Sequence, residues 1–213
     1  MSLRFIALLS VVVLLVNCVQ KKMDASRLCM EFYQLNKNKN FDGLFDVAIA
    51  KDRVKSVYND SLRQNEMFFN WIAVFDSDSG FYVRVPVFRR GADIINKKSV
   101  FRSLTPSVRR FLTAKLSVKS DTAALYDSYV NYIESTYAKY YGIAVPPENN
   151  NKNIGIEGNP MVGKFITFDL TKTAKVYYLA DKSSPNEYWS THFNKITKID
   201  QNWYYEVVPA KDK

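Results

Sequence analysis

The chain has 213 residues, 47% of them hydrophobic, and a formal net charge of +9. This length suits one domain with a hydrophobic core of its own. The basic residues are dispersed, and their densest groups are three pairs, Arg89-Arg90, Lys97-Lys98 and Arg109-Arg110. Because no block of five or six like charges and no aromatic–basic RNA motif occurs, we expect no nucleic-acid partner, while a weak attraction to an anionic membrane surface stays open.

The first notable segment is an apolar run from Phe5 to Val16, interrupted only by Ser10. It is too short to cross a bilayer, which takes roughly 20 apolar residues, and it lacks the polar face of an amphipathic helix. A compact apolar run behind a basic residue is typical of a signal peptide. An uncleaved signal anchor and a cytosolic protein are the alternatives.

The run ends in Leu15-Val16-Asn17-Cys18, which resembles the lipobox of bacterial lipoproteins except that Asn17 replaces the usual small residue. We therefore predict a lipoprotein signal peptide at 1–17, a lipidated tether at 18–23 and a single α+β domain at 24–213. Two or three acyl chains on Cys18 would attach the protein to a membrane. Because Val19 is not an aspartate retention signal, the outer membrane is favoured over the inner one.

Lipidation of Cys18 would leave Cys29 as the only thiol, which excludes an intramolecular disulfide. Cys29 falls on the apolar face of a helix predicted from Asp24 to Leu35. The polar stretch 36–40 ends this helix. The spacing of apolar residues then predicts a second helix over 41–48 and a third over 54–62.

Two β-rich runs follow, 67–75 and 81–88, joined by the polar stretch 76–80. Asp76, Asp78 and Gly80 resemble the start of a calcium loop. However, Gly80 stands at loop position 5 and Val87 at position 12, where such a loop needs glycine at position 6 and glutamate at position 12. We therefore predict a tight turn.

Thr105 and Pro106 are typical of the start of a helix, and Ser120 or Asp121 starts a longer one that ends at Gly142. The tyrosine stripe of this longer helix is interpreted as core packing, because tyrosine buries its ring while keeping its hydroxyl paired. Residues 146–160 are rich in Pro, Asn and Gly and predict a long surface loop. The remaining segments predict strands with a hairpin turn at 199–203: 164–170, 175–180, 188–199 and 203–208.

Little in the chain suggests catalysis. His192 is the only histidine, and neither a zinc-binding spacing nor a nucleophile or nucleotide motif occurs. We therefore predict no catalytic residue, no metal and no cofactor. His192 is expected in the middle of a strand; if it faced a cavity it could act as a general base.

Two segments, "ASRLCMEFYQLNKNKNFDGLFDVAIAKD" and "KVYYLADKSSPNEYWSTHFNKITKIDQNWYYEVV", resemble the opening helices and the terminal hairpin of the nuclear-transport-factor-2-like superfamily, which includes the SnoaL-like proteins. The resemblance implies a cone-like α+β fold in which helices pack on a curved antiparallel sheet, here with a C-terminal β-meander. Residues 67–160 carry more structure than compact members have. In that superfamily some members perform acid/base chemistry in the cone and others bind ligands or partners.

The leading functional hypothesis is a non-catalytic, lipid-anchored envelope protein that binds a small ligand or an envelope protein. The alternatives are an envelope hydrolase or isomerase that uses acidic residues with or without His192, and a structural protein that contacts anionic membrane or cell wall. Aromatic residues dominate pockets and interfaces. The candidate pocket or interface residues are Trp189, His192, Trp203 and Tyr205.

Overall fold

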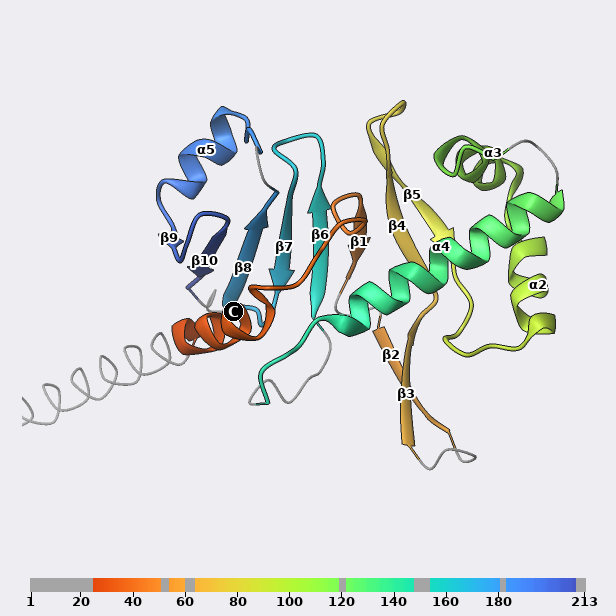
Figure 1. Ribbon diagram of the computed structural model, residues 1–213, viewed down its shortest axis with the longest axis horizontal. Helices are drawn as coiled ribbons and strands as arrows, with labels where there is room; N and C mark the ends of the chain where they lie inside the picture. Colours follow the sequence, from red (N-terminus) through yellow and green to blue (C-terminus); the bar gives the residue numbers. More distant parts are fainter. Residues whose placement is uncertain are drawn as a thin grey trace, which may run out of the picture.

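The computed structural model describes residues 25–50, 54–59, 64–118, 122–147, 154–180 and 183–209. The predicted signal peptide, Cys18 and the tether lie outside these ranges. The described residues form an α+β fold with five helices and an eight-stranded antiparallel sheet (Figure 1). The strands follow in spatial order: β5 (Phe81–Pro86), β4 (Trp71–Asp76), β1 (Val47–Ile49), β6 (Gly155–Asn159), β7 (Phe165–Asp169), β8 (Ala174–Leu179), β10 (Trp203–Val207) and β9 (Thr197–Lys198).

The helices cover the sheet unequally. The N-terminal helix (25–36) and α4 (Thr122–Gly142) pack on one face, and α2 (Ile94–Arg102) and α3 (Pro106–Lys115) lie at the end beside β5. At the other end α5 (Glu187–Phe193) lies beside β9 and β10 (Figure 1). A separate hairpin of β2 (Val54–Asn59) and β3 (Gln64–Phe69) leads into β4.

The two faces of the sheet follow from strand alternation, because successive side chains point to opposite sides. On β7, Ile166 and Phe168 face the large core under the N-terminal helix and α4, whereas Phe165 belongs to a second cluster. The same alternation on β8 sends Val176 inward and Tyr177 to the second cluster. The protein therefore has two apolar clusters, one on each face.

Aromatic rings fill the space between the N-terminal helix and the sheet. Trp203 is 2% exposed and stacks on Phe168, with ring centroids 6.1 Å apart. It also contacts Phe41 at 5.6 Å and Tyr178 at 4.9 Å between ring centroids. Cys29 is fully buried beside them, and burial raises the pKa of its thiol to about 12. This fits the predicted structural, unreactive cysteine.

The tyrosine stripe of α4 is core, as predicted. Tyr129, Tyr137 and Tyr140 are each at most 4% exposed. Their hydroxyls donate hydrogen bonds to the backbone carbonyls of Pro86, Phe88 and Ile154 respectively. A buried hydroxyl without a partner is costly, so these bonds let three phenols enter the core.

Several predicted elements are confirmed. They are the N-terminal helix, the β4–β5 hairpin with its turn at 76–80, the start of α3 at Thr105 and the end of α4 at Gly142. The strands near 165–169, 174–179 and 203–207 are also confirmed. The Thr105 hydroxyl accepts from the Val108 N–H, as an N-cap should. Strong local signals therefore fixed these positions.

Other predictions were wrong. Residues 41–48 form turns and the start of β1, because Gly43 adopts a positive φ of 83° that ends helical geometry. Residues 54–59 pair with 64–69 as a hairpin. Residues 155–159 form β6 inside the predicted loop, and α2 was not foreseen. Residues 187–193 form α5 where a strand was expected, so this helix interrupts the C-terminal β-meander.

Candidate functional site

The candidate site is built around α5 on the second face of the sheet. Asn186 starts this helix: its side-chain oxygen accepts a hydrogen bond of 3.0 Å from the Trp189 N–H. Glu187 stands in the first turn, where a carboxylate interacts favourably with the helix dipole. Asn186-Glu187 after Pro185 is a helix-start signal that the apolar pattern of the following residues outweighed in the sequence interpretation.

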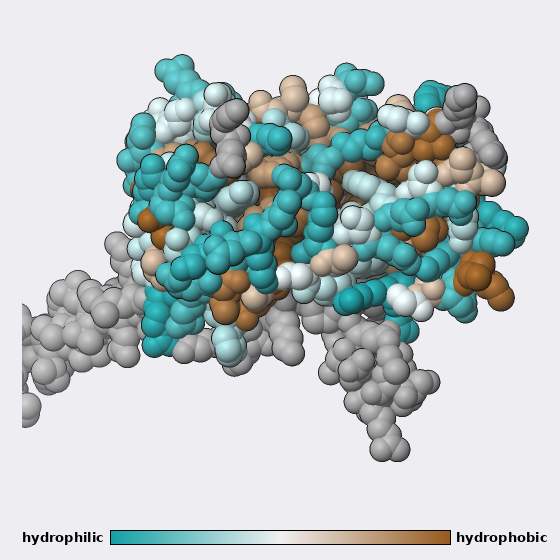
Figure 2. Space-filling view, in the orientation of Figure 1, coloured by the Kyte–Doolittle hydropathy of each residue, from teal (hydrophilic) through white to brown (hydrophobic). Residues whose placement is uncertain are grey.

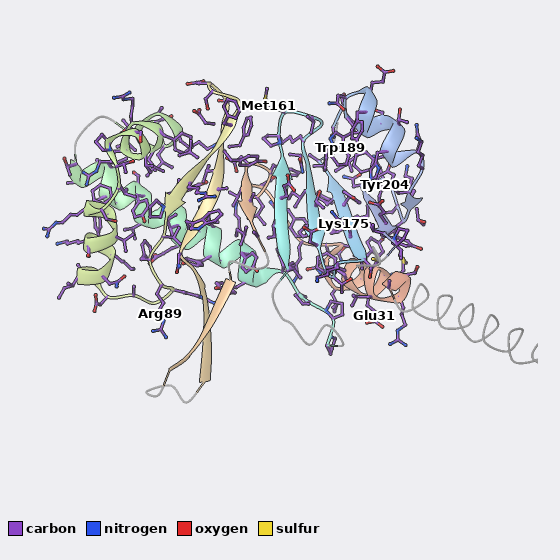
Figure 3. All side chains as sticks on the ribbon, turned by 180° about the vertical axis from the view of Figure 1, so that it is seen from behind. Glu31, Arg89, Met161, Lys175, Trp189 and Tyr204 are labelled. Carbon is purple, nitrogen blue, oxygen red and sulfur yellow. The ribbon has the colours of Figure 1, made fainter. Side chains whose placement is uncertain are left out.

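Aromatic packing holds α5 against the sheet. Trp189 and Phe193 lie over Phe165, with ring centroids 4.5 Å and 5.3 Å away. Tyr204 contacts Phe193 at 5.0 Å between centroids. In Figure 3, which views the protein from behind, Trp189 and Tyr204 lie at the same end of the sheet, next to α5. We call Phe165, Tyr177, Trp189, Phe193 and Tyr204 the α5 cluster.

A short polar chain runs along the edge of the α5 cluster. The Tyr177 hydroxyl donates a 2.8 Å hydrogen bond to Glu206 Oε2, and His192 Nε2 lies 3.6 Å from the same oxygen. Burial, and next the hydrogen bond to Glu206, raise the pKa of Tyr177 far above its usual value, and the charges of Glu206, Asp169 and Glu157 add to this effect. Tyr177 is therefore a stable neutral donor to the carboxylate.

His192 has an incomplete environment. Its Nε2 atom is enclosed by protein and makes no hydrogen bond to any residue that the structure describes. The His192 ring packs edge-on against Trp189 and Tyr177, at 5.2 Å and 5.7 Å between centroids. An enclosed ring nitrogen just beyond hydrogen-bond distance from a carboxylate can complete the bond with a small shift of the helix.

Two open depressions flank α5. One, of about 440 Å³, is lined by Glu187, Tyr188, Thr191, His192 and Lys195. The other, of about 340 Å³, lies between α5 and the β9–β10 turn, and its polar lining includes Ser183, Ser190, Asn194, Gln201, Asn202 and Tyr204. Tyr188 is 71% exposed and stands at the first depression. The first depression thus offers an aromatic side chain with hydroxyl, imidazole and charged groups beside it.

The structure divides the four predicted residues between the two faces. Trp189 and His192 meet on α5, as described above. Trp203 lies in the large core, and Tyr205 packs against that core from the same strand face. Trp203 is therefore a core residue, and His192 lies on a helix rather than in the middle of a strand.

Sequence reasoning missed Tyr177, Tyr188 and Glu206. Tyr177 and Glu206 are 29 residues apart and meet only because β8 pairs with β10. Strand alternation could have placed Tyr177 and Tyr178 on opposite faces, but no local signal says which face carries α5. The exposure of Tyr188 could not be predicted without knowing that residues 187–193 form a helix, because Tyr188 lies on the outer side of that helix.

Comparison with family models, with curated proteins and with solved structures finds no match for this chain. Within the described ranges, no three His, Cys, Asp or Glu side chains are grouped so that they could hold a metal ion. None of the helices in those ranges combines the length and apolar composition that a membrane span requires.

Proposed function

We propose that this chain is a lipid-anchored envelope protein that binds a ligand or protein partner through the exposed side of α5. The observation that carries the binding site is Tyr188, which is 71% exposed on a helix held rigidly by the α5 cluster and borders the larger depression. Exposed aromatic residues on a rigid support are common anchors in interfaces. The site needs no catalysis to fulfil this role.

The anchor part of the proposal rests on sequence. The apolar run 5–16 followed by Leu15-Val16-Asn17-Cys18 supports export and acylation of Cys18. An outer-membrane location, facing the periplasm or the cell surface, goes with it. We also propose that the helices and the sheet correspond to the cone-like arrangement of the nuclear-transport-factor-2-like superfamily; the support is the resemblance of the two sequence segments.

Replacing each cysteine in turn tests the anchor. The substitution Cys18→Ser is expected to abolish labelling by a fatty-acid analogue and to release the protein from the membrane fraction. Cys29→Ser is the matched control, because Cys29 is fully buried in the core and should keep both properties. A Cys18→Ser protein that is still acylated and membrane-bound would rule out the proposed anchor.

A photocrosslinking residue in place of Tyr188 tests the binding site in intact cells. It is expected to give a discrete adduct. The matched control is the same residue in place of Phe81, which is 75% exposed on β5 at the far side of the sheet. Adducts common to both positions, or no adduct from position 188, would contradict binding at α5.

Acid–base chemistry is the second candidate function, and one observation favours it. His192 Nε2 lies 3.6 Å from Glu206 Oε2, the carboxylate oxygen that accepts the hydrogen bond from the Tyr177 hydroxyl. In such a site His192 would take a proton from a substrate in the depression and Glu206 would stabilise the imidazolium. Turnover in an ester and glycoside panel that falls about 100-fold in His192→Gln, with the fold intact, would support it. A panel in which wild type is inert excludes these two reaction classes.

A further inference from the structure

Most of the net positive charge of the chain lies in one segment, residues 89–118, which we call the basic lobe. Residues 89–118, which contain α2 and α3, hold eight Lys and Arg against the single acidic residue Asp93, a formal charge of +7 out of the chain's +9. The three basic pairs that look separate in the sequence all fall within this lobe. The Arg109 guanidinium joins its two helices, since it donates hydrogen bonds to the carbonyls of Phe101, Arg102 and Leu104.

Several of these cations have structural roles. Arg109 caps the end of α2, Lys97 pairs with Glu134, and Lys115 pairs with Asp46. Lys98, Arg102 and Arg110 differ: they are exposed, and none makes an ion pair with a residue in the described part of the chain. These three charges are therefore available to an external partner.

The outward side of α2 combines charge with exposed apolar side chains. Phe101 faces the core and Lys97 faces Glu134 on α4. Helical spacing places Ile95, Lys98 and Arg102 one above the other on a side of α2 that is turned about 100° away from Phe101. Ile94, in the first turn, lies between that side and the side of Phe101, next to Lys98. Ile94 is 66% and Ile95 80% exposed. Figure 2 shows an apolar patch over α2 at the edge of the molecule, with hydrophilic residues around it. We call Ile94, Ile95, Lys98 and Arg102 the α2 face.

We infer that the α2 face docks on an anionic lipid bilayer. Acidic headgroups attract the lobe, and the two isoleucines enter the interface between headgroups and acyl chains, as apolar residues of interfacial helices do. A nucleic acid or an acidic protein surface would match the charge. Neither would provide the continuous apolar layer below it that two adjacent exposed isoleucines require to leave water.

This contact does not depend on a lipid at Cys18. The N-terminal helix and α2 lie at opposite ends of the long axis of the molecule (Figure 1). A protein that used both attachments would lie along the bilayer instead of standing on its tether. The α2 face would then orient the α5 site, which lies at the same end as the N-terminal helix, relative to the membrane.

Vesicle flotation of the unlipidated chain tests the inference. A chain that begins at Val19 retains every described residue and thus the whole core, and circular dichroism checks its fold. It is expected to float with vesicles of phosphatidylcholine mixed with phosphatidylglycerol and to stay behind with phosphatidylcholine alone. Lys98→Glu combined with Arg102→Glu should weaken the binding by about 30-fold or more.

Two further variants separate the docking face from general attraction. Lys172→Glu combined with Lys198→Glu makes the same charge change at two exposed sites elsewhere and should bind as wild type does. Ile94→Ser combined with Ile95→Ser should weaken binding by about tenfold or more. In about 1 M salt, which screens the charges, wild type should keep a residual binding through its isoleucines. The variant that carries Ile94→Ser and Ile95→Ser should lose this residual binding.

Three results would overturn the inference. They are equal flotation of wild type with neutral and anionic vesicles, equal losses in the two charge-reversal variants, and no effect of the isoleucine substitutions. A chain that ignores both vesicle types and binds a nucleic acid or an acidic protein would also contradict it. Because this chain lacks Cys18, each outcome is independent of the proposed lipid anchor.

Discussion

At Gly158 the turn before β1 passes so close to β6 that no side chain fits. A Cβ atom at this position would overlap the backbone of Phe45 and the carbonyl oxygen of Leu44. Backbone atoms cannot rotate aside as a flexible side chain can. Gly158 is therefore required by the close approach of two segments that are distant in sequence, rather than by its conformational freedom.

The substitution Gly158→Ala is expected to destabilise the protein by about 2–3 kcal/mol, because β1 or β6 must shift to admit the methyl group. Urea unfolding measures the loss. Gly142→Ala is the control: nothing lies within 4 Å of the added Cβ at the end of α4, so its stability should be unchanged or slightly raised. Equal stabilities for the two variants would contradict the close approach.

Asn36 shows how one buried polar residue joins two elements. It is fully buried at the end of the N-terminal helix. Its amide nitrogen donates to the carbonyls of Phe32 and Ala144, and its amide oxygen accepts from the Ala144 N–H. The side chain thereby satisfies backbone groups at the end of one helix and just beyond the end of α4.

At the scale of elements, α5 depends on the sheet. A helix of seven residues is too short to be stable alone in water, so its structure is stabilised by the rings beneath it. Phe193 is the most buried of these helix residues, at 6% exposed, and it contacts Phe165, Tyr177 and Tyr204. The rigidity of the α5 site therefore depends on these aromatic contacts of Phe193.

The substitution Phe193→Ala is expected to cost about 3 kcal/mol, since it leaves a ring-sized cavity between α5 and the sheet. Amide hydrogen exchange should show that α5 opens much more often while strands β6 and β7 keep their protection. The matched control on the same helix is Tyr188→Ala, which removes an exposed ring and should change stability by less than about 0.5 kcal/mol. Uniform loss of protection in all elements would argue against α5 as a separate unit.

For the molecule as a whole, buried tyrosines dominate the alkaline side of the stability profile. Burial raises the pKa of the half-buried Tyr141 to about 12, and it raises the pKa values of five more tyrosines still further, namely Tyr129, Tyr132, Tyr137, Tyr140 and Tyr177. These phenols stay protonated in the folded chain after they would ionise in the unfolded one. The unfolded state therefore binds fewer protons at high pH, and stability falls as pH rises.

This stabilising contribution is complete below about pH 10, the ordinary tyrosine value, and is lost as pH rises toward the raised pKa values. Each deeply buried phenol then costs about 1.4 kcal/mol per pH unit. We expect cooperative unfolding near pH 11–12. One alkaline titration monitored by both phenolate absorbance and circular dichroism measures it. Ionisation of all tyrosines near pH 10 with the fold unchanged would contradict the prediction.

The sequence by itself determined those elements whose signals are local. Thr105-Pro106 started α3, Gly142 ended α4, and the polar stretch 76–80 joined β4 to β5, because caps and turns are chosen by a few adjacent residues. The tyrosine stripe of α4 was correctly interpreted as core because its helical period repeats over several turns. The net charge was also evident, though not its concentration on α2 and α3 as one lobe.

Only the tertiary structure decided the short elements and the site. Residues 47–49 became β1 because β4 and β6 pair with them from both sides. Asn186 and Glu187 are a local helix-start signal, but a helix of seven residues is stable only because the rings of the second face cover Trp189 and Phe193. Pairing of β8 with β10 brought Tyr177 to Glu206, beside His192, and sent Trp203 to the opposite face. Such contacts join residues far apart in the chain, so no local pattern encodes them, whereas caps, turns and long helical periods need only their neighbours.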